Sequence, residues 1–167
     1  MSEHQVITRA ALLLALTLIF QSLRFFIPLP PGLSTFIIGS LVNATLLLAA
    51  EKVGLWPALM IASIAPIVAY FQQLLPLPVF IVPVALGNAV YIGLFLSNLR
   101  WGGRVLAVGL GTIGKAGVLY GAFLWLLTVI EVPPKLAAGI MLAMSWPQLV
   151  TGILGGIIAA LVVKRIR

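Results

Sequence analysis

The sequence predicts an all-α polytopic membrane protein: a bundle of six transmembrane helices forming a single integral membrane domain over residues 1–167, with both termini cytoplasmic. Three observations predict this fold class. Apolar residues make up 62% of the chain and charged residues only 8%, whereas soluble globular chains are about half apolar and a quarter charged. The mean hydropathy is +1.23. The apolar residues also recur in stretches long enough to cross a bilayer.

Each predicted span has a length close to the 17 to 25 residues that a helix needs to cross a hydrocarbon core of about 30 Å. The breaks between spans are rich in proline, glycine or charge, as in Arg100-Trp-Gly-Gly-Arg104. The first span is expected to remain as a helix, because its apolar stretch is long and no small-residue cleavage site follows it. The predicted spans are residues 6–26, 34–50, 55–75, 79–99, 105–130 and 136–163.

The basic residues predict the orientation, since cytoplasmic loops carry an excess of Lys and Arg. With the N-terminus inside, only Arg24 and Lys135 lie near the outer surface. Trp56 and Trp101 then fall at the cytoplasmic interface, where indole rings prefer to lie. The basic residues placed inside are Arg9, Lys52, Arg100, Arg104, Lys164, Arg165 and Arg167.

The polar composition argues against most chemistry. The chain has no Cys, no Asp, one His and three Glu, so we expect no disulfide, no metal site, no cofactor and no enzymatic activity. The net charge is +7, but the basic residues are scattered between apolar spans and form no basic face. We therefore expect the bilayer, and not a nucleic acid, to be the partner that this charge serves.

One glycine-rich segment, GLGTIGKA at 109–116, has the spacing of a nucleotide-binding loop. A phosphate loop needs Ser or Thr after the lysine to hold Mg²⁺, but Ala116 stands there, and the next residues are apolar on every side. We interpret the glycines as helix-packing surfaces of the kind that GxxxG motifs form. These glycines are Gly111, Gly114, Gly117 and Gly121 in the fifth span, and Gly152 and Gly156 in the sixth.

Polar side chains in four spans are predicted at one depth near the bilayer centre, namely Asn43, Asn88, Lys115 and Gln148. We expect Asn43 to serve mainly as a hydrogen-bond partner within the bundle. Lys115 is different, because no carboxylate lies within any span to pair with it, so an anionic or acceptor-rich ligand is expected. Amides, aromatic rings and one cation suit a flat heterocycle. The candidate substrate-binding residues are Asn88, Tyr91, Lys115, Ser145, Trp146 and Gln148.

Four segments resemble the substrate-binding S components of energy-coupling factor (ECF) transporters, which are small six-helix proteins of prokaryotic cell membranes. They are Ala11-Leu-Leu-Leu-Ala15, GSLVNA at 39–44, LGNA at 86–89 and SWPQL at 145–149. The resemblance implies that Ala11 and Ala15 contact a transmembrane coupling subunit, which carries two ATPase subunits. It also implies capture of a vitamin or related micronutrient outside the cell, in a pocket that Lys115 either lines or supports from below.

Other functions remain as alternatives. A non-transporting membrane scaffold of the MreD type has a similar size and would need no pocket. A membrane-embedded enzyme lacks candidate bases within the spans, and a channel fits poorly with small-residue seams that favour close packing. The substrate is left open among riboflavin-, pantothenate-, folate-, pyrimidine- and queuosine-type solutes.

Overall fold

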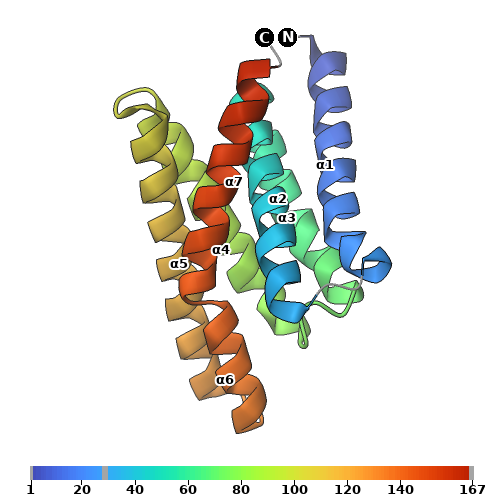
Figure 1. Cartoon of the computed structure of the whole chain (residues 1–167), viewed down its shortest axis with the longest axis vertical. Coiled ribbons are helices and arrows are strands. Elements are labelled where there is room, and N and C mark those ends of the chain that lie inside the picture. Colours follow the sequence, from blue (N-terminus) through green and yellow to red (C-terminus); the bar gives the residue numbers. More distant parts are fainter. Residues whose placement is uncertain (1, 28–29, 166–167) are drawn as a thin grey trace.

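The protein is a bundle of α-helices, seen in a computed structural model that describes residues 2–27 and 30–165, apart from the side chain of Pro31. Figure 1 shows the long helices running side by side. Five apolar segments have the length and composition of a membrane span, counting α6 and α7 as one, and α3 is a shorter apolar helix. The helices are α1 (Glu3–Phe26), α2 (Pro31–Lys52), α3 (Leu55–Phe71), α4 (Ile81–Leu99), α5 (Gly103–Val129), α6 (Pro134–Ala143) and α7 (Trp146–Arg165), and a 3₁₀ turn, η1 (Pro78–Phe80), precedes α4.

Both ends of the chain lie at one end of the bundle (Figure 1). The α2–α3 turn lies near the start of α5, because Arg104 forms a two-point ion pair with Glu51, with N–O distances of 2.8 and 2.6 Å. This end carries the basic residues that the positive-inside rule predicts to be cytoplasmic. We therefore call it the cytoplasmic end of the bundle, and the opposite end the outer end. Trp56 and Trp101 are 76% and 91% exposed. Arg167, which was assigned to the same side, lies outside the described residues.

The third helix ends earlier than the sequence predicts, at Phe71 and not at residue 75. The Gln72 backbone N–H still donates to Val68 at 2.9 Å, but Gln73 adopts a positive φ of 59°. A residue in the left-handed conformation cannot continue a right-handed α-helix, so the helix stops here. The residues up to Leu77 therefore form a loop at the outer end.

The predicted sixth span is divided into α6 and α7, with a break at Met144 and Ser145. Pro147 has no N–H, and a proline ring clashes with the carbonyl four residues earlier, which here belongs to Ala143. The side chain of Gln148 compensates, since its Nε2 donates to that carbonyl at 2.9 Å. The single helix predicted over 136–163 was therefore wrong at this point.

The glycines of α7 pack closely against two neighbouring helices. A Cβ on Gly155 would lie 2.6 Å from Cβ of Asn43 in α2, and one on Gly156 would collide with Val108 in α5. The predicted seam on α5 is confirmed only in part. Gly111 and Gly114 contact α4, whereas a Cβ on Gly117 or Gly121 would have no atom within 4 Å, so the GxxxG motif at 117–121 makes no helix contact within the described chain.

Burial differs sharply between the first two helices. In α2, 61% of the most apolar window is buried, against 11% in α1. The buried residues of α1 are Thr17 and Gln21. The Thr17 hydroxyl lies 2.8 Å from that of Thr45 in α2, and the Gln21 amide donates to the Ala65 carbonyl in α3 at 3.2 Å. A third polar contact joins Gln72 Nε2 to the Ser22 hydroxyl at 2.9 Å, and Leu13 and Leu14 pack against the core. Helix α1 is thus a peripheral helix with few buried side chains (Figure 1).

Candidate functional site

A buried lysine lies where three helices meet. Lys115 of α5 is 5% exposed, and its Nζ donates to Oδ1 of Asn43 in α2 at 2.5 Å. The amide nitrogen of Asn43 donates in turn to Oγ1 of Thr151 in α7 at 3.3 Å. Asn43 and Thr151 are each 2% exposed. Helices α2, α5 and α7 are therefore joined by polar side chains in the interior of the bundle, where hydrogen bonds between helices are expected.

Tyr91 adds the fourth helix. Its ring centroid lies 5.4 Å from Nζ of Lys115, within the range of a cation–π interaction. Its hydroxyl donates to the Gly152 carbonyl in α7 at 2.7 Å, and the residue is fully buried. We call Asn43, Tyr91, Lys115 and Thr151 the lysine network.

The charge of the lysine network is not balanced by a carboxylate. Among the described residues, the recorded ion pair joins Glu51 to Arg104 at the cytoplasmic end, and no group of His, Cys, Asp or Glu could hold a metal ion. An ammonium has three N–H donors, and one of these is used by Asn43. A further acceptor for the other two would be favourable, because a cation within a membrane span is costly without partners.

Asn88 lies one helical turn from Tyr91 toward the outer end of α4, about 4.5 Å along the axis. It is 4% exposed, and its amide has no hydrogen-bond partner among the residues that the structure describes. The amide atoms of Asn88 are not among the fully enclosed polar atoms that lack a partner, so they keep some accessible surface. Asn88 is thus a polar group with unused hydrogen-bonding capacity on the outer side of the lysine network.

The remaining candidates lie at the break between α6 and α7. The Ser145 hydroxyl donates to the Leu142 carbonyl at 2.7 Å, and Gln148 caps Ala143 as described above. Trp146 is 53% exposed, and its ring lies 5.5 Å from that of Phe36, centroid to centroid. All three therefore lie near the outer end of α2, where Phe36 is located.

The predicted common depth is correct for Asn43 and Lys115, which touch, and wrong for Gln148. The residue of α7 at the level of Lys115 is Thr151, one turn further toward the cytoplasm, about 4.5 Å along the helix. Sequence reasoning missed Thr151 because threonine is common in membrane helices and satisfies itself locally. Its position directly before the glycine-rich seam of α7 was the available signal.

Ala11 and Ala15 lie on the bare side of α1. Both side chains are exposed, and Leu12 and Ile19 beside them are 65% and 59% exposed. Ala11 also lines an apolar groove of about 340 Å³ between α1 and α3. The structure therefore leaves this small-residue motif uncovered by the rest of the chain.

The family profile of the ECF transporter substrate-specific component matches the chain over residues 5–167. The match covers all seven helices apart from the first two residues of α1. No curated protein and no solved structure matches the chain significantly.

Proposed function

The chain belongs to the family of substrate-specific components of ECF transporters, and from this premise we propose that it captures a vitamin or related micronutrient outside the cell. The chain is then a multi-pass protein of a prokaryotic plasma membrane. The transporter subunit itself binds a small molecule and performs no chemistry. The family match carries this proposal, and the geometry of the site supports it.

We place the substrate pocket on the outer side of the lysine network. Three features support this position: the unpaired amide of Asn88, the half-exposed ring of Trp146, and the break between α6 and α7, where Ser145 and Gln148 bond only to nearby carbonyls. A helix break is tolerated at membrane depth where it lines a cavity or is buried in protein. In this arrangement Lys115 and Tyr91 form the floor of the pocket.

The chemistry of these residues suits an acceptor-rich, flat ligand. The two remaining N–H groups of Lys115 favour a carboxylate or an electronegative ring, the amides of Asn88 and Gln148 read donors and acceptors, and Trp146 offers a stacking surface. An anionic group would also neutralise the one buried cation of the lysine network. The ligand class is therefore an anionic or carbonyl-rich heterocycle.

Delivery of the substrate requires partners. We propose that the exposed face of α1 around Ala11 and Ala15 docks on a transmembrane coupling subunit, which works with two ATPase subunits. Small residues let a partner helix approach closely, and the scarce burial of α1 leaves this face available. Docking here does not touch the lysine network, which lies on α2, α4, α5 and α7.

The capture step is tested by purifying the protein in mild detergent and identifying any co-purified small molecule by mass spectrometry. Saturable binding of that molecule is then measured for the wild type, Asn88→Ala and Lys115→Met. Lys135→Met is the matched control, because it removes a lysine that is exposed at the outer end. We expect binding to weaken at least tenfold in the first two variants and to be unchanged in the control.

No saturable binding across a panel of vitamins would contradict the proposal and favour the scaffold alternative, for which the structure offers no separate support.

The docking step is tested with Trp at both Ala11 and Ala15, with Ala138→Trp on α6 as a control of equal bulk on another exposed alanine. Uptake should be lost in the double variant while ligand binding persists. Normal uptake with both tryptophans in place would show that the docking face lies elsewhere.

A further inference from the structure

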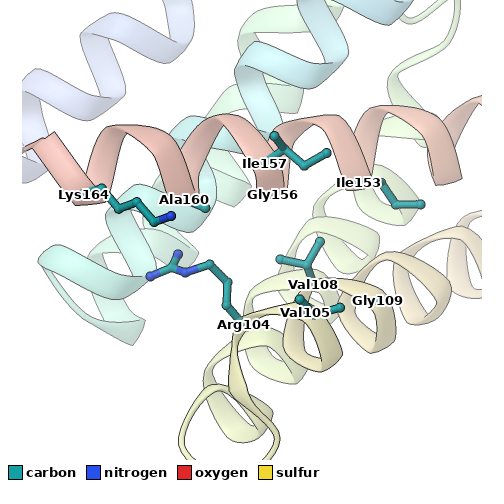
Figure 2. Close-up of a pocket in the computed structure, with 9 residues that line it drawn as sticks. All are labelled: Arg104, Val105, Val108, Gly109, Ile153, Gly156, Ile157, Ala160 and Lys164. Atoms are coloured by element: carbon teal, nitrogen blue, oxygen red, sulfur yellow. The ribbon is translucent and has the colours of Figure 1, made fainter.

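A groove unrelated to the lysine network lies between α5 and α7 in the cytoplasmic half of the bundle. Its volume is about 660 Å³, within the range of about 300 to 1,000 Å³ of small-molecule sites. Figure 2 shows Val108 and Gly109 of α5 on one side, and Gly156 and Ile157 of α7 on the other. Apart from one end, the lining is apolar. An apolar groove of this kind accepts a hydrocarbon chain.

The groove stays open because small residues line part of it. A Cβ on Gly109 would have no atom within 4 Å, so this glycine borders empty space. Gly156, by contrast, is in tight contact with Val108, since a Cβ added to Gly156 would collide with the Val108 side chain. The two helices therefore touch at Gly156 and diverge beside Gly109.

Two cations stand at the cytoplasmic end of the groove. Figure 2 shows Arg104 of α5 and Lys164 of α7 extending toward each other across this end. Arg104 is held by its two bonds to Glu51, which leave its Nε–H unused. Lys164 is exposed and has no carboxylate partner among the described residues. Because Glu51 neutralises Arg104, the net positive charge at this end of the groove comes from Lys164, while Arg104 contributes an unused N–H donor.

We infer that this groove binds an anionic phospholipid of the cytoplasmic leaflet, with one acyl chain between α5 and α7 and the phosphate between Arg104 and Lys164. An apolar groove that ends in the Lys164 ammonium and the free Nε–H of the paired Arg104 matches the two parts of such a lipid. Basic pockets between transmembrane helices on the cytoplasmic side recognise anionic headgroups in this way. A zwitterionic lipid fits the groove equally well but gains less from the cations.

The test is native mass spectrometry of the purified protein with equal amounts of dioleoyl-phosphatidylglycerol and dioleoyl-phosphatidylcholine. We expect phosphatidylglycerol adducts to predominate. Lys164→Gln should weaken them about fivefold, the effect of one basic residue near an anionic surface. Gly109→Phe fills the groove and should reduce the phosphatidylglycerol adducts to a similar extent. Arg165→Gln and Gly117→Phe are matched controls, since neither residue lines the groove and Gly117 also borders open space.

Three results would overturn the inference. Equal retention of the two lipids would show that the cations do not select a headgroup. Adducts as abundant in Lys164→Gln and Gly109→Phe as in their controls would place the lipid elsewhere. A change in the dimer population, or loss of the co-expressed coupling subunit in Gly109→Phe with lipid adducts unchanged, would identify the groove as a protein interface.

Discussion

The contact between α2 and α7 at Gly155 allows a quantitative prediction for Gly155→Ala. The added Cβ would lie 2.6 Å from Cβ of Asn43, 2.9 Å from the Ser40 carbonyl oxygen and 3.0 Å from the Ala44 nitrogen. Carbon atoms pack best at about 3.5 to 4.0 Å, and two of these three neighbours are backbone atoms that cannot rotate away. The two helices must therefore separate by roughly 1 Å.

This separation has two costs. Overpacking of a well-packed contact costs about 1 to 3 kcal/mol. The bond from Asn43 to Thr151 is already 3.3 Å long, so it would be broken, at a further cost of about 1 kcal/mol. We expect Gly155→Ala to lower the free energy of unfolding by about 2 to 4 kcal/mol.

Reversible unfolding in mixed detergent and SDS, followed by circular dichroism, measures this difference. Gly117→Ala is the control, because its new methyl group would meet no atom within 4 Å. Ligand affinity should fall in Gly155→Ala alone, since Asn43 also orients Lys115. Equal stability of Gly155→Ala and Gly117→Ala would refute the close approach of α2 and α7 and the reasoning built on it.

Further predictions concern three other interactions. Lys115→Met should change the free energy of unfolding by less than about 2 kcal/mol, because removal of a buried charge offsets the loss of its bonds. Ligand binding should be lost in the same variant. Strong destabilisation in SDS titrations would show that Lys115 has a structural role instead. Glu51→Gln should lower the free energy of unfolding by about 1 kcal/mol, because it removes the partly exposed ion pair with Arg104, and this loss should be smaller at high salt. The same titrations at two salt concentrations measure the difference. A loss that does not depend on salt would contradict an ionic origin. Thr17→Val should lower the free energy of unfolding by about 0.6 kcal/mol, because it removes the hydroxyl contact with Thr45. Amide hydrogen exchange should become faster in α1 alone. Unchanged exchange in α1 would show that this contact does not stabilise the packing of the helix.

Much of the bundle follows from composition and length, because a bilayer permits few backbone structures and sets the length of each span. The helix ends were less predictable. Pro66 lies within α3 without ending it, whereas Pro147 accompanies a full break, and the nearby Gln148 caps the freed carbonyl. A proline alone does not reveal which of these outcomes the surrounding helices will stabilise.

The candidate site was predictable as a buried lysine without a carboxylate, since none of the predicted spans contains an acidic residue. Its partners were not predictable from depth alone, because depth does not say which faces of the helices meet. Asn43 and Thr151 join Lys115 through the rotation of α2 and α7, which their glycine contacts determine. The binding roles of all six candidates stay predictions, namely those of Asn88, Tyr91, Lys115, Ser145, Trp146 and Gln148.

The bond between Asn43 and Thr151 also has a consequence for biogenesis. It joins residues 108 positions apart, one in α2 and the other in α7. Lys115 of α5 can donate to the Asn43 oxygen as soon as α5 is in place, but the amide nitrogen of Asn43 lacks its acceptor until α7 inserts. Helix α7 therefore completes the lysine network, and a chain truncated before α7 should be a target for membrane quality control.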